Sequence, residues 1–416
     1  MAGPNRENVN VNDMIIYQAG TVLSSLVKQA TGQTVIKAST PGEFVSVATT
    51  ALKTGYDPIL NAMSQMWGTT IFSVRPYSRM FKGMEMDMER WGNATRKLSI
   101  ADKAIEDDAR FQYPVGYDAG QTPATGDGKS VDMFSLNKPD VLQTNFYGQA
   151  VYENSYTIFR DNLDTAFTSP AEFMRFTSMV AQNRSDKLEQ YRENIARGLL
   201  ANYAGSLLAE AQESRVIHLL TEYNALTGLS LTAQTVYQPA NFAPFMRWVF
   251  SRVSVLSKLM RERSEMFQTV VNNKHVMRHT PADRLKVYMY TPAMEQMMAM
   301  VNSITYNDDF IKYTDFEAVN FWQSIKTPDA IAVNPTYTLP DGTVTTKTAA
   351  DNSVGVEKIG IFGLMFDEDA LGYAQVNAWN QLTPFNAKGG YWNDFDHVNF
   401  RTMQDMTEKG LILLLD

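Results

Sequence analysis

The C-terminal segment, residues 359–416, constrains the fold of this chain more than any other part of the sequence. Short apolar runs recur along it, each followed by residues typical of turns, and the final run is Leu411–Leu415. The end of a chain usually frays in water unless it is tied into the fold. The final run is therefore predicted to be a buried strand that belongs to a sheet.

A long amphipathic helix is predicted to begin at Pro170. Ser169-Pro-Ala-Glu172 has the form of a capping box with proline at the first helical position. Apolar residues then recur at helical spacing: Phe173, Phe176, Val180, Leu188, Tyr191, Ile195, Leu199, Tyr203 and Leu207. This spacing predicts one buried stripe on a helix that runs to about Leu208 and packs on the C-terminal strands. Gly198 and Gly205 are positions where the helix would bend or end.

A long two-stranded excursion is predicted between residues 69 and 163. Met84-Glu-Met-Asp-Met-Glu89 alternates strictly, which is typical of a half-buried strand. A second extended stretch covers residues 141–159, and residues 114–139 between them are rich in turn-forming residues. A hairpin of this kind is marginal on its own, so we expect it to lie against another surface.

Further elements are predicted on both sides of this excursion. Short helices are expected over residues 13–31, over residues 42–53 and, with an Asp57 cap before Pro58, up to Gly68. Residues 213–355 read as a separate lobe. The lobe should contain a helix over residues 243–267, a strand over residues 285–290 followed by a methionine-rich helix, and a surface hairpin that turns at Pro340-Asp-Gly342.

Composition excludes several classes of protein. The 416 residues exceed the usual size of one core. There is no cysteine, which excludes disulfides and thiolate chemistry. The chain has no apolar run long enough to span a bilayer and no secretory leader pattern, so folding in the cytoplasm is expected. Acidic residues outnumber basic ones, 45 to 37, which suits a shell that encloses nucleic acid without gripping it, and equally an ordinary acidic protein.

Three C-terminal motifs carry a resemblance to a known family. They are Phe366-Asp-x-Asp-Ala370, Pro384-Phe-Asn-x-x-Gly-x-Tyr-Trp-Asn393 and Thr407-Glu-x-Gly-Leu-Ile412. In this order the segment resembles the C-terminal sheet of tailed-bacteriophage major capsid proteins of the Hong Kong 97 type, especially those of small podovirus-like phages. The order of the predicted elements along the whole chain also resembles that family.

The resemblance implies an α+β, Hong Kong 97-like capsid fold in five parts. These are an N-terminal arm (1–41), a P-domain with the spine helix (42–68 and 164–212), an extended E-loop hairpin (69–163), an A-domain with a surface hairpin (213–355) and C-terminal P-domain strands (356–416). It also implies self-assembly into hexamers and pentamers of an icosahedral head, built in the host cytoplasm and enclosing double-stranded phage DNA that is contacted non-specifically. Scaffolding, portal or decoration proteins are further partners that it implies. One loop lysine, Lys129, lies where some relatives place a crosslinking lysine.

Candidate chemical sites in the sequence are incomplete. Gly126-Asp-Gly-Lys-Ser130 resembles the end of a phosphate-binding loop, but Pro123 stands where glycine is needed and the flanks are loop-like. His275 and His279 have the spacing of a zinc pair on a helix, yet no glutamate follows His275 and Pro281 interrupts the segment. The first is better explained by a flexible loop tip, and the second by paired surface histidines.

Three other groups also have simpler explanations. His397, beside Asp394 and Asp396, is interpreted as a structural histidine. Met84, Met86 and Met88 form a thioether row for copper or, more simply, an apolar strand face. Asp367, Glu368 and Asp369 lack the alternating oxygens of a calcium loop and read as a turn.

The sequence therefore predicts a structural shell protein with no catalytic, cofactor-binding or metal residues, and not an enzyme. Two alternatives stay open at this point. One is the shell protein of a cellular nanocompartment, similar to an encapsulin, which would enclose a cargo enzyme. The other is a soluble enzyme whose site no motif reveals.

Overall fold

A computed structural model describes residues 11–31, 40–69, 77–86, 95–101, 140–296, 316–348 and 354–416. The chain forms two compact units, each assembled from segments that are distant in sequence. The first unit combines residues 1–92, 148–196 and 373–402, and the second combines residues 93–147, 197–372 and 403–416. Contacts thus divide the C-terminal strands between the two units, whereas the sequence groups them as one part. The five named parts remain a prediction.

The first unit combines helices with a three-stranded sheet. Its helices are α1 (Val11–Thr31), α2 (Pro41–Thr54), α3 (Tyr56–Thr69), α4 (Arg160–Ala166) and the first part of α5 (Pro170–Glu210). The sheet has the order β12-β13-β3, formed by β12 (Leu371–Leu382), β13 (Tyr391–Gln404) and β3 (Gly148–Phe159). β13 and β3 are antiparallel, with Trp392 opposite Ile158.

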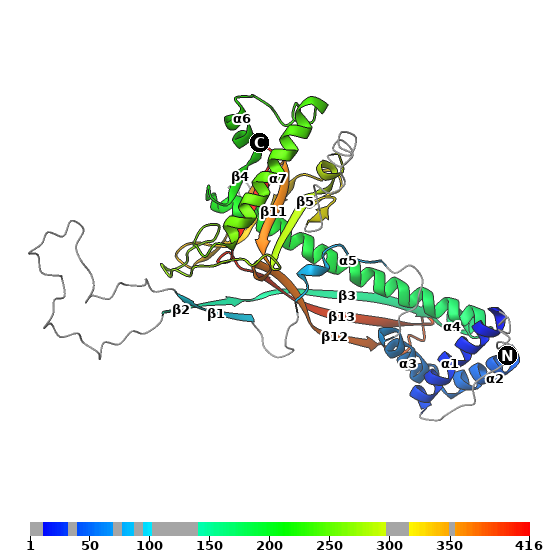
Figure 1. The fold of residues 1–416 in the computed structure, drawn as a ribbon. Coiled ribbons are helices and arrows are strands. Elements are labelled where there is room, and N and C mark those ends of the chain that lie inside the picture. The colour runs from blue at the N-terminus through cyan, green and yellow to red at the C-terminus, as the bar shows by residue number, and fades with distance from the viewer. Residues whose placement is uncertain are drawn as a thin grey trace, which may run out of the picture. The chain divides into compact units, whose positions relative to one another are not determined.

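Helix α5 and this sheet run side by side (Figure 1). Burial along β13 alternates residue by residue, because successive side chains point to opposite faces of a strand. The ring of Tyr191 in α5 packs against both strands. Its centroid lies 4.7 Å from that of the Tyr152 ring in β3 and 5.9 Å from that of the Phe400 ring in β13. The prediction that the helix packs on C-terminal strands is confirmed.

The helices α1, α2 and α3 form a second part of the core of this unit. Their buried faces meet residues of α4 and α5, and the Phe44 and Phe173 rings lie 5.6 Å apart. Thr40 caps α2 in a complete capping box. Helix α3 begins at Tyr56, so Asp57 lies in its first turn instead of capping it, and the Asp57 carboxylate accepts a hydrogen bond from Trp392 Nε1 at 2.6 Å. The prediction of an Asp57 cap is therefore wrong.

The second unit is built on a mixed five-stranded sheet with the order β4-β14-β11-β5-β6. The strands are β4 (Val216–His218), β5 (Leu285–Tyr290), β6 (Glu317–Val319), β11 (Ile361–Asp367) and β14 (Gly410–Leu414). β11 pairs antiparallel with β14 and β5, while β14 pairs in parallel with β4. Every residue of β11 and β14 is buried. The predicted C-terminal strand is confirmed and lies inside the sheet.

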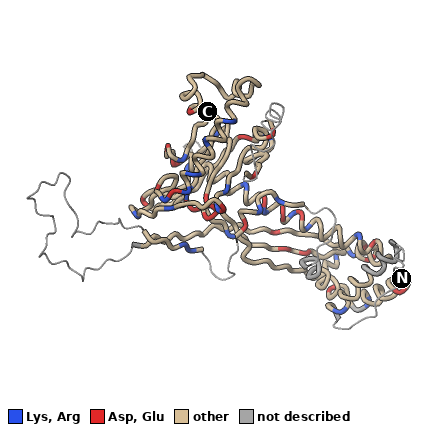
Figure 2. Tube along the Cα trace, in the orientation of Figure 1, with Lys and Arg blue, Asp and Glu red and all other residues tan. Residues whose placement is uncertain are grey.

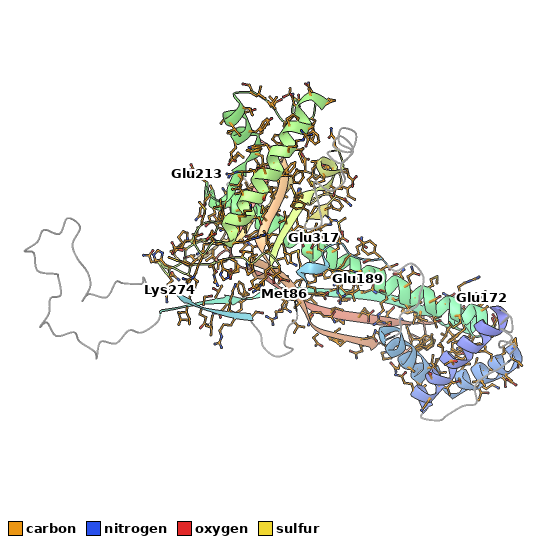
Figure 3. The ribbon with its side chains drawn as sticks, viewed as in Figure 1. Met86, Glu172, Glu189, Glu213, Lys274 and Glu317 are labelled. Atoms are coloured by element: carbon orange, nitrogen blue, oxygen red, sulfur yellow. The ribbon has the colours of Figure 1, made fainter. Side chains whose placement is uncertain are left out.

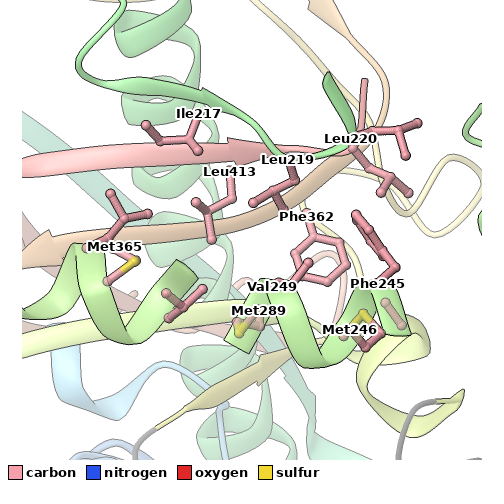
Figure 4. Packing of buried hydrophobic residues seen from close by; sticks show 14 of the residues in the cluster. Ile217, Leu219, Leu220, Phe245, Met246, Val249, Met289, Phe362, Met365 and Leu413 are labelled. Atoms are coloured by element: carbon pink, nitrogen blue, oxygen red, sulfur yellow. The ribbon is translucent and has the colours of Figure 1, made fainter. Parts of the chain in front are cut away.

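Helix α7 (Pro239–Arg261) covers this sheet together with α6 (Leu219–Thr227). The apolar side chains of α7 pack against those of the strands (Figure 4). They include Phe245, Met246 and Val249 of the helix and Phe362, Met365 and Leu413 of the strands. Each fully buried side chain of this size stabilises the fold by about 1.5–3 kcal/mol. The helix ends earlier than the predicted residue 267, because the backbone turns extended at Glu262.

Three two-stranded sheets complete the second unit. They are β1 (Thr95–Ala101) with β2 (Asp140–Phe146), β7 (Ile331–Val333) with β10 (Val356–Lys358), and β8 (Thr336–Thr338) with β9 (Val344–Thr346). The predicted hairpin turn is confirmed, since Leu339 N–H donates to the Thr343 carbonyl and Gly342 takes a φ of +83°. The predicted tip of the long excursion, residues 114–139, lies outside the described residues.

The predicted methionine strand is wrong where the structure describes it. Residues 82–84 form a short 3₁₀ turn, η1 (Lys82–Met84), and Met84 is buried. Only a single bridge follows, in which the Met86 N–H donates to the Tyr373 carbonyl. Met88 lies outside the described residues. Over the described residues 84–86, the alternating sequence therefore forms a turn followed by one bridge.

Helix α5 continues through Gly198 and Gly205, so neither glycine ends it. Ile195, predicted to be buried, is only half-buried. Buried apolar positions in this part of the helix include Ala196, Leu200, Ala201, Tyr203, Ala204 and Leu207. The predicted stripe is therefore confirmed at Tyr203 and Leu207, whereas at Ile195 and Leu199 the next residue along the helix is the buried one.

These two glycines should respond oppositely to alanine. A Cβ at position 198 meets nothing within 4 Å, so Gly198→Ala should raise the free energy of unfolding by about 0.5–1 kcal/mol through helix propensity alone. A Cβ at position 205 would collide with Val333 and lie 3.1 Å from Pro335 Cβ, so Gly205→Ala should destabilise the protein. Urea unfolding of the unassembled protein measures both. Equal shifts in the two variants would contradict this packing.

Candidate functional site: the buried charged turn

Residues 405–410, here called the charged turn, join β13 to β14 with the sequence Asp-Met-Thr-Glu-Lys-Gly. All six are buried, although Asp, Glu and Lys are almost never fully buried unless they are paired. The turn contains the beginning of the Thr407-Glu-x-Gly-Leu-Ile412 motif. Its burial requires partners for each of its charged side chains.

Several backbone groups of the charged turn form hydrogen bonds with distant segments. The Met406 carbonyl accepts from Thr269 N–H at 2.9 Å, and the Lys409 carbonyl accepts from Asp367 N–H at 2.9 Å. The Gly410 N–H donates to the Phe267 carbonyl at 2.8 Å. Glycine is required at position 410 because any Cβ there would overlap the Tyr203 hydroxyl of α5. The turn is therefore in contact with β11, with the segment that contains Phe267 and Thr269, and with α5.

Arg215 is the central cation of this arrangement. It is completely buried, and its Nε donates to the Gly410 carbonyl at 3.0 Å. Its Nη1 pairs with Glu210 Oε2 at 2.9 Å and donates to Thr269 Oγ1 at 2.7 Å, while Nη2 donates to the Tyr203 hydroxyl at 3.3 Å. Burial raises the pKa of Tyr203 to about 12, so this hydroxyl stays neutral. One guanidinium thus joins the end of α5 to the charged turn.

The carboxylates of the turn hold the β1-β2 pair. Lys97 Nζ of β1 lies 2.9 Å from Asp405 Oδ2 and 2.5 Å from Glu408 Oε1. Arg278 pairs with Glu408 at 3.1 Å and donates to Ser99 Oγ at 2.8 Å. Burial lowers the pKa of the Lys97 ammonium, but Asp405 and Glu408 outweigh this and hold that pKa above its ordinary value. Burial also raises the pKa of Glu408, against the attraction of Lys97 and Arg278.

A further lysine fastens the other strand of this pair. Lys274, labelled in Figure 3, donates from Nζ to the Val141 carbonyl of β2 at 2.6 Å. It follows a tight turn in which Asn272 and Asn273 both take positive φ values. Asparagine tolerates this left-handed conformation better than most residues. Both strands are therefore attached to the rest of the second unit by cations.

Lys409 is buried, and its Nζ donates to the Glu262 carbonyl at 2.6 Å and to Ser264 Oγ at 3.0 Å. Burial lowers the pKa of the Lys409 ammonium to about 8, against the attraction of Glu262. The cation is therefore held by neutral oxygens where the end of α7 meets the turn.

The first unit contains a separate acidic pair. Asp394 and Asp396 point to the buried face of β13, where Asn380 Nδ2 donates to both at 2.7 Å and Arg184 pairs with both. His397 belongs to the opposite face of the strand, and its ring stacks 3.9 Å from the Trp379 ring. The structure therefore does not bring His397 together with these aspartates, and the carboxylate–histidine pair is not formed.

The remaining candidate residues are separate or outside the described residues. The segment with His275 and His279 is not helical, and His275 Nδ1 lies 2.6 Å from Glu265 Oε1. Asp367 caps the turn η2 (Glu368–Ala370), which contains Glu368 and Asp369, and Arg284 pairs with Asp369 at 2.5 Å. Gly126–Ser130 and Lys129 lie outside the described residues. No set of three or more His, Asp or Glu within the described part of the chain is placed to hold a metal ion.

Sequence reasoning missed the charged turn as a site. Three charged residues within six predict an exposed loop, and nothing in the neighbouring sequence indicates which residues pair with them. Arg215 and Lys97 lie 195 and about 300 residues away from the atoms they bind. The only available signal was that a charged stretch stands directly before the most apolar run of the chain.

Lys97→Met should loosen β1 by leaving two buried carboxylates without their cation. Breaking a fully buried pair costs about 3–5 kcal/mol, and because Lys97 is partly exposed we expect about 2 kcal/mol. Hydrogen exchange over residues 95–101 and 140–146 should become faster. The control is Arg96→Met, which removes the same charge from the exposed face of the same strand. Equal exchange in the two variants would show that the pairs do not hold β1.

The buried Lys409 ammonium should make the free energy of unfolding depend on pH in the alkaline range. Its pKa is lower in the folded chain than in the unfolded chain, so the unfolded chain binds more protons between about pH 8 and 10. Stability contributed by this group should therefore rise with pH across that window. Urea midpoints measured on both sides of pH 8 should show this gain in the wild type and not in Lys409→Met. A parallel response of the two proteins would exclude Lys409 as the source.

No helix among the described residues has the length and apolar character to cross a bilayer. Comparison with families of known proteins gives a match to the model of the Phi29-like phage major capsid protein over residues 23–402. A search of curated proteins finds no match.

Two solved structures show the same fold. One is described as the capsid structure of Staphylococcus phage Andhra, with a TM-score of 0.53, 11% identity, and coverage of 83% of this chain and 87% of that chain. The other is described as the structure of head fiber and inner core protein gp22 of native bacteriophage P68, with a TM-score of 0.52 and the same identity and coverage. These likenesses confirm the predicted Hong Kong 97-like fold class. Because the family model spans most of its length, the chain belongs to the Phi29-like phage major capsid protein family and is a structural protein of the phage head.

Proposed function

We propose that this protein is the repeating subunit of an icosahedral head, arranged as hexamers and pentamers around double-stranded DNA and assembled in the host cytoplasm. Membership of a major capsid protein family supports this proposal. Portal, scaffolding or decoration proteins are its further partners in the proposal. The spine-helix role belongs to α5 and the E-loop role to the segment that contains β1 and β2.

The observation that carries the assembly proposal is the two-faced character of the β1-β2 pair. One face holds Lys97, Ser99, Leu142 and Phe146 and is directed at the rest of the second unit. The other face exposes Leu98, Ile100 and Val141, which are 58%, 67% and 44% exposed. Ile100 lies directly opposite Val141 in the register, so the three side chains form one apolar patch.

A two-stranded ribbon with an open apolar face is unstable in isolation. Here the charged turn stabilises it from the inner side, so its outer face stays available without unfolding. Exposed apolar patches on such elements commonly mark protein interfaces. The natural occupant in a shell built from identical subunits is a neighbouring copy of this chain, which would cover the outer face of the ribbon.

The same observations support a structural rather than a chemical role. The charged side chains of the charged turn bind charged groups and backbone carbonyls of neighbouring segments. A catalytic site instead needs titratable groups that face a substrate. We propose that the protein performs no chemistry on small molecules and that its function is assembly.

The variant Leu98→Asp with Ile100→Asp should fold but fail to assemble. Both side chains are exposed in the subunit, so the folded chain tolerates the charges, whereas a buried interface would not. Circular dichroism reports folding and analytical ultracentrifugation reports shells. The control is Leu226→Asp, at an exposed leucine of α6. Normal shells from the double variant, or an equal loss in both variants, would contradict the assigned role of the ribbon.

A further inference from the structure

Helix α7 has a charge composition opposite to that of the whole chain. The protein has a formal net charge of −8, yet the 23 residues of α7 contain no aspartate or glutamate and carry Arg247, Arg252, Lys258 and Arg261. Basic positions recur along this helix without an acidic one (Figure 2). Net charge alone therefore conceals a local basic surface.

The basic residues of α7 lie on one straight stripe. Arg247, Ser251, Ser254, Lys258 and Arg261 follow one another at spacings of four, three, four and three, and all are exposed. Such spacing keeps side chains on one face of a helix, over roughly 21 Å at 1.5 Å per residue. The opposite face is the buried one that packs on the sheet. Every member of this stripe, which we call the α7 stripe, is a hydrogen-bond donor.

The cations of the α7 stripe differ from the neighbouring Arg252 in their partners among the described residues. Arg252, beside the stripe, is neutralised by Glu222 at 2.7 and 2.9 Å. Within the described residues, Arg247, Lys258 and Arg261 form no ion pair. Lys258 and Arg261 also suit the negative end of the helix dipole, but Arg247 lies in the first half of the helix, where the dipole gives no reason for a cation. The acidic neighbour at the end of the stripe is Glu262.

We propose that the α7 stripe binds the phosphodiester backbone of double-stranded DNA without reading its sequence. This inference rests on the proposed function, in which the shell encloses such DNA. Arginine, lysine and serine are the side chains that donate to phosphate oxygens in protein–DNA interfaces, and a straight row of donors fits a line of phosphates. Val255 and Leu259, exposed beside the stripe, would suit an acidic protein helix instead, and the experiment separates the two partners.

The size of the effect follows from the number of cations. Three cations that each neutralise one phosphate give a salt slope of about −2.7, so affinity should fall about 40-fold between 50 and 200 mM salt. One subunit then binds DNA weakly, whereas many stripes on one shell act together through their high effective concentration. Such contacts would hold the DNA against the shell while each single contact stays weak enough to be released.

The test compares two variants with the same loss of charge. Arg247→Gln with Lys258→Gln and Arg261→Gln removes the α7 stripe, and Lys326→Gln with Lys347→Gln and Lys388→Gln removes three exposed lysines elsewhere. Fluorescence anisotropy with a short random-sequence duplex, over a series of salt concentrations, measures the affinity. We expect the stripe variant to lose at least tenfold in affinity and most of the salt slope, while the control stays within about twofold of the wild type.

Several results would overturn the inference. They are a wild type that does not bind the duplex, an equal loss in the two variants, or stripe-dependent binding of an acidic amphipathic helical peptide in place of DNA. Sedimentation of the same samples tests the proposed function separately. Shells formed by the stripe variant, together with lost DNA affinity, support both proposals. A wild type that binds DNA through the α7 stripe but forms no shells would contradict the proposed function and still support DNA binding by the stripe.

Discussion

The second unit depends on burying the charges of residues 405–410. A buried carboxylate or ammonium loses its hydration and is tolerated only when good partners replace the water. Asp405, Glu408 and Lys409 can be buried only if β1, α5 and the end of α7 are all in position. Any of these elements, if displaced, would leave a charge unpaired. The charged turn therefore selects one arrangement of the unit, even though an apolar turn of the same shape would contribute at least as much stability.

The parts of the fold that the sequence predicted well are those with a local cause. Pro340-Asp-Gly342 forms the expected turn, the apolar stripe of α7 is buried as its spacing indicates, and Leu411–Leu414 form a buried strand. In each case the information lies within a few residues. Helices and strands can be predicted for the same reason, because their apolar residues recur with a characteristic period.

The parts that were missed have distant causes. Met84 and Met86 alternate with acidic residues as a strand would, but Arg79 and Tyr373 bind this segment and a turn results. Ile195 looks like the centre of a stripe, yet alanines on the adjacent face meet the closer neighbours. The charged turn is the clearest case, since its composition predicts exposure and only partners from other segments make burial possible. Local patterns cannot show which side chains a fold brings together.

The position of β14 within its sheet also sets an order of events. β14 lies between β4 and β11, and it is synthesised after every other strand of that sheet. Until it has left the ribosome, β4 lacks a partner and β11 is paired on one side only, so the second unit cannot complete its core. Domains generally fold as units once their residues are available. The growing chain therefore completes the second unit only after β14 has been synthesised. Translation and shell assembly are thus separated in time.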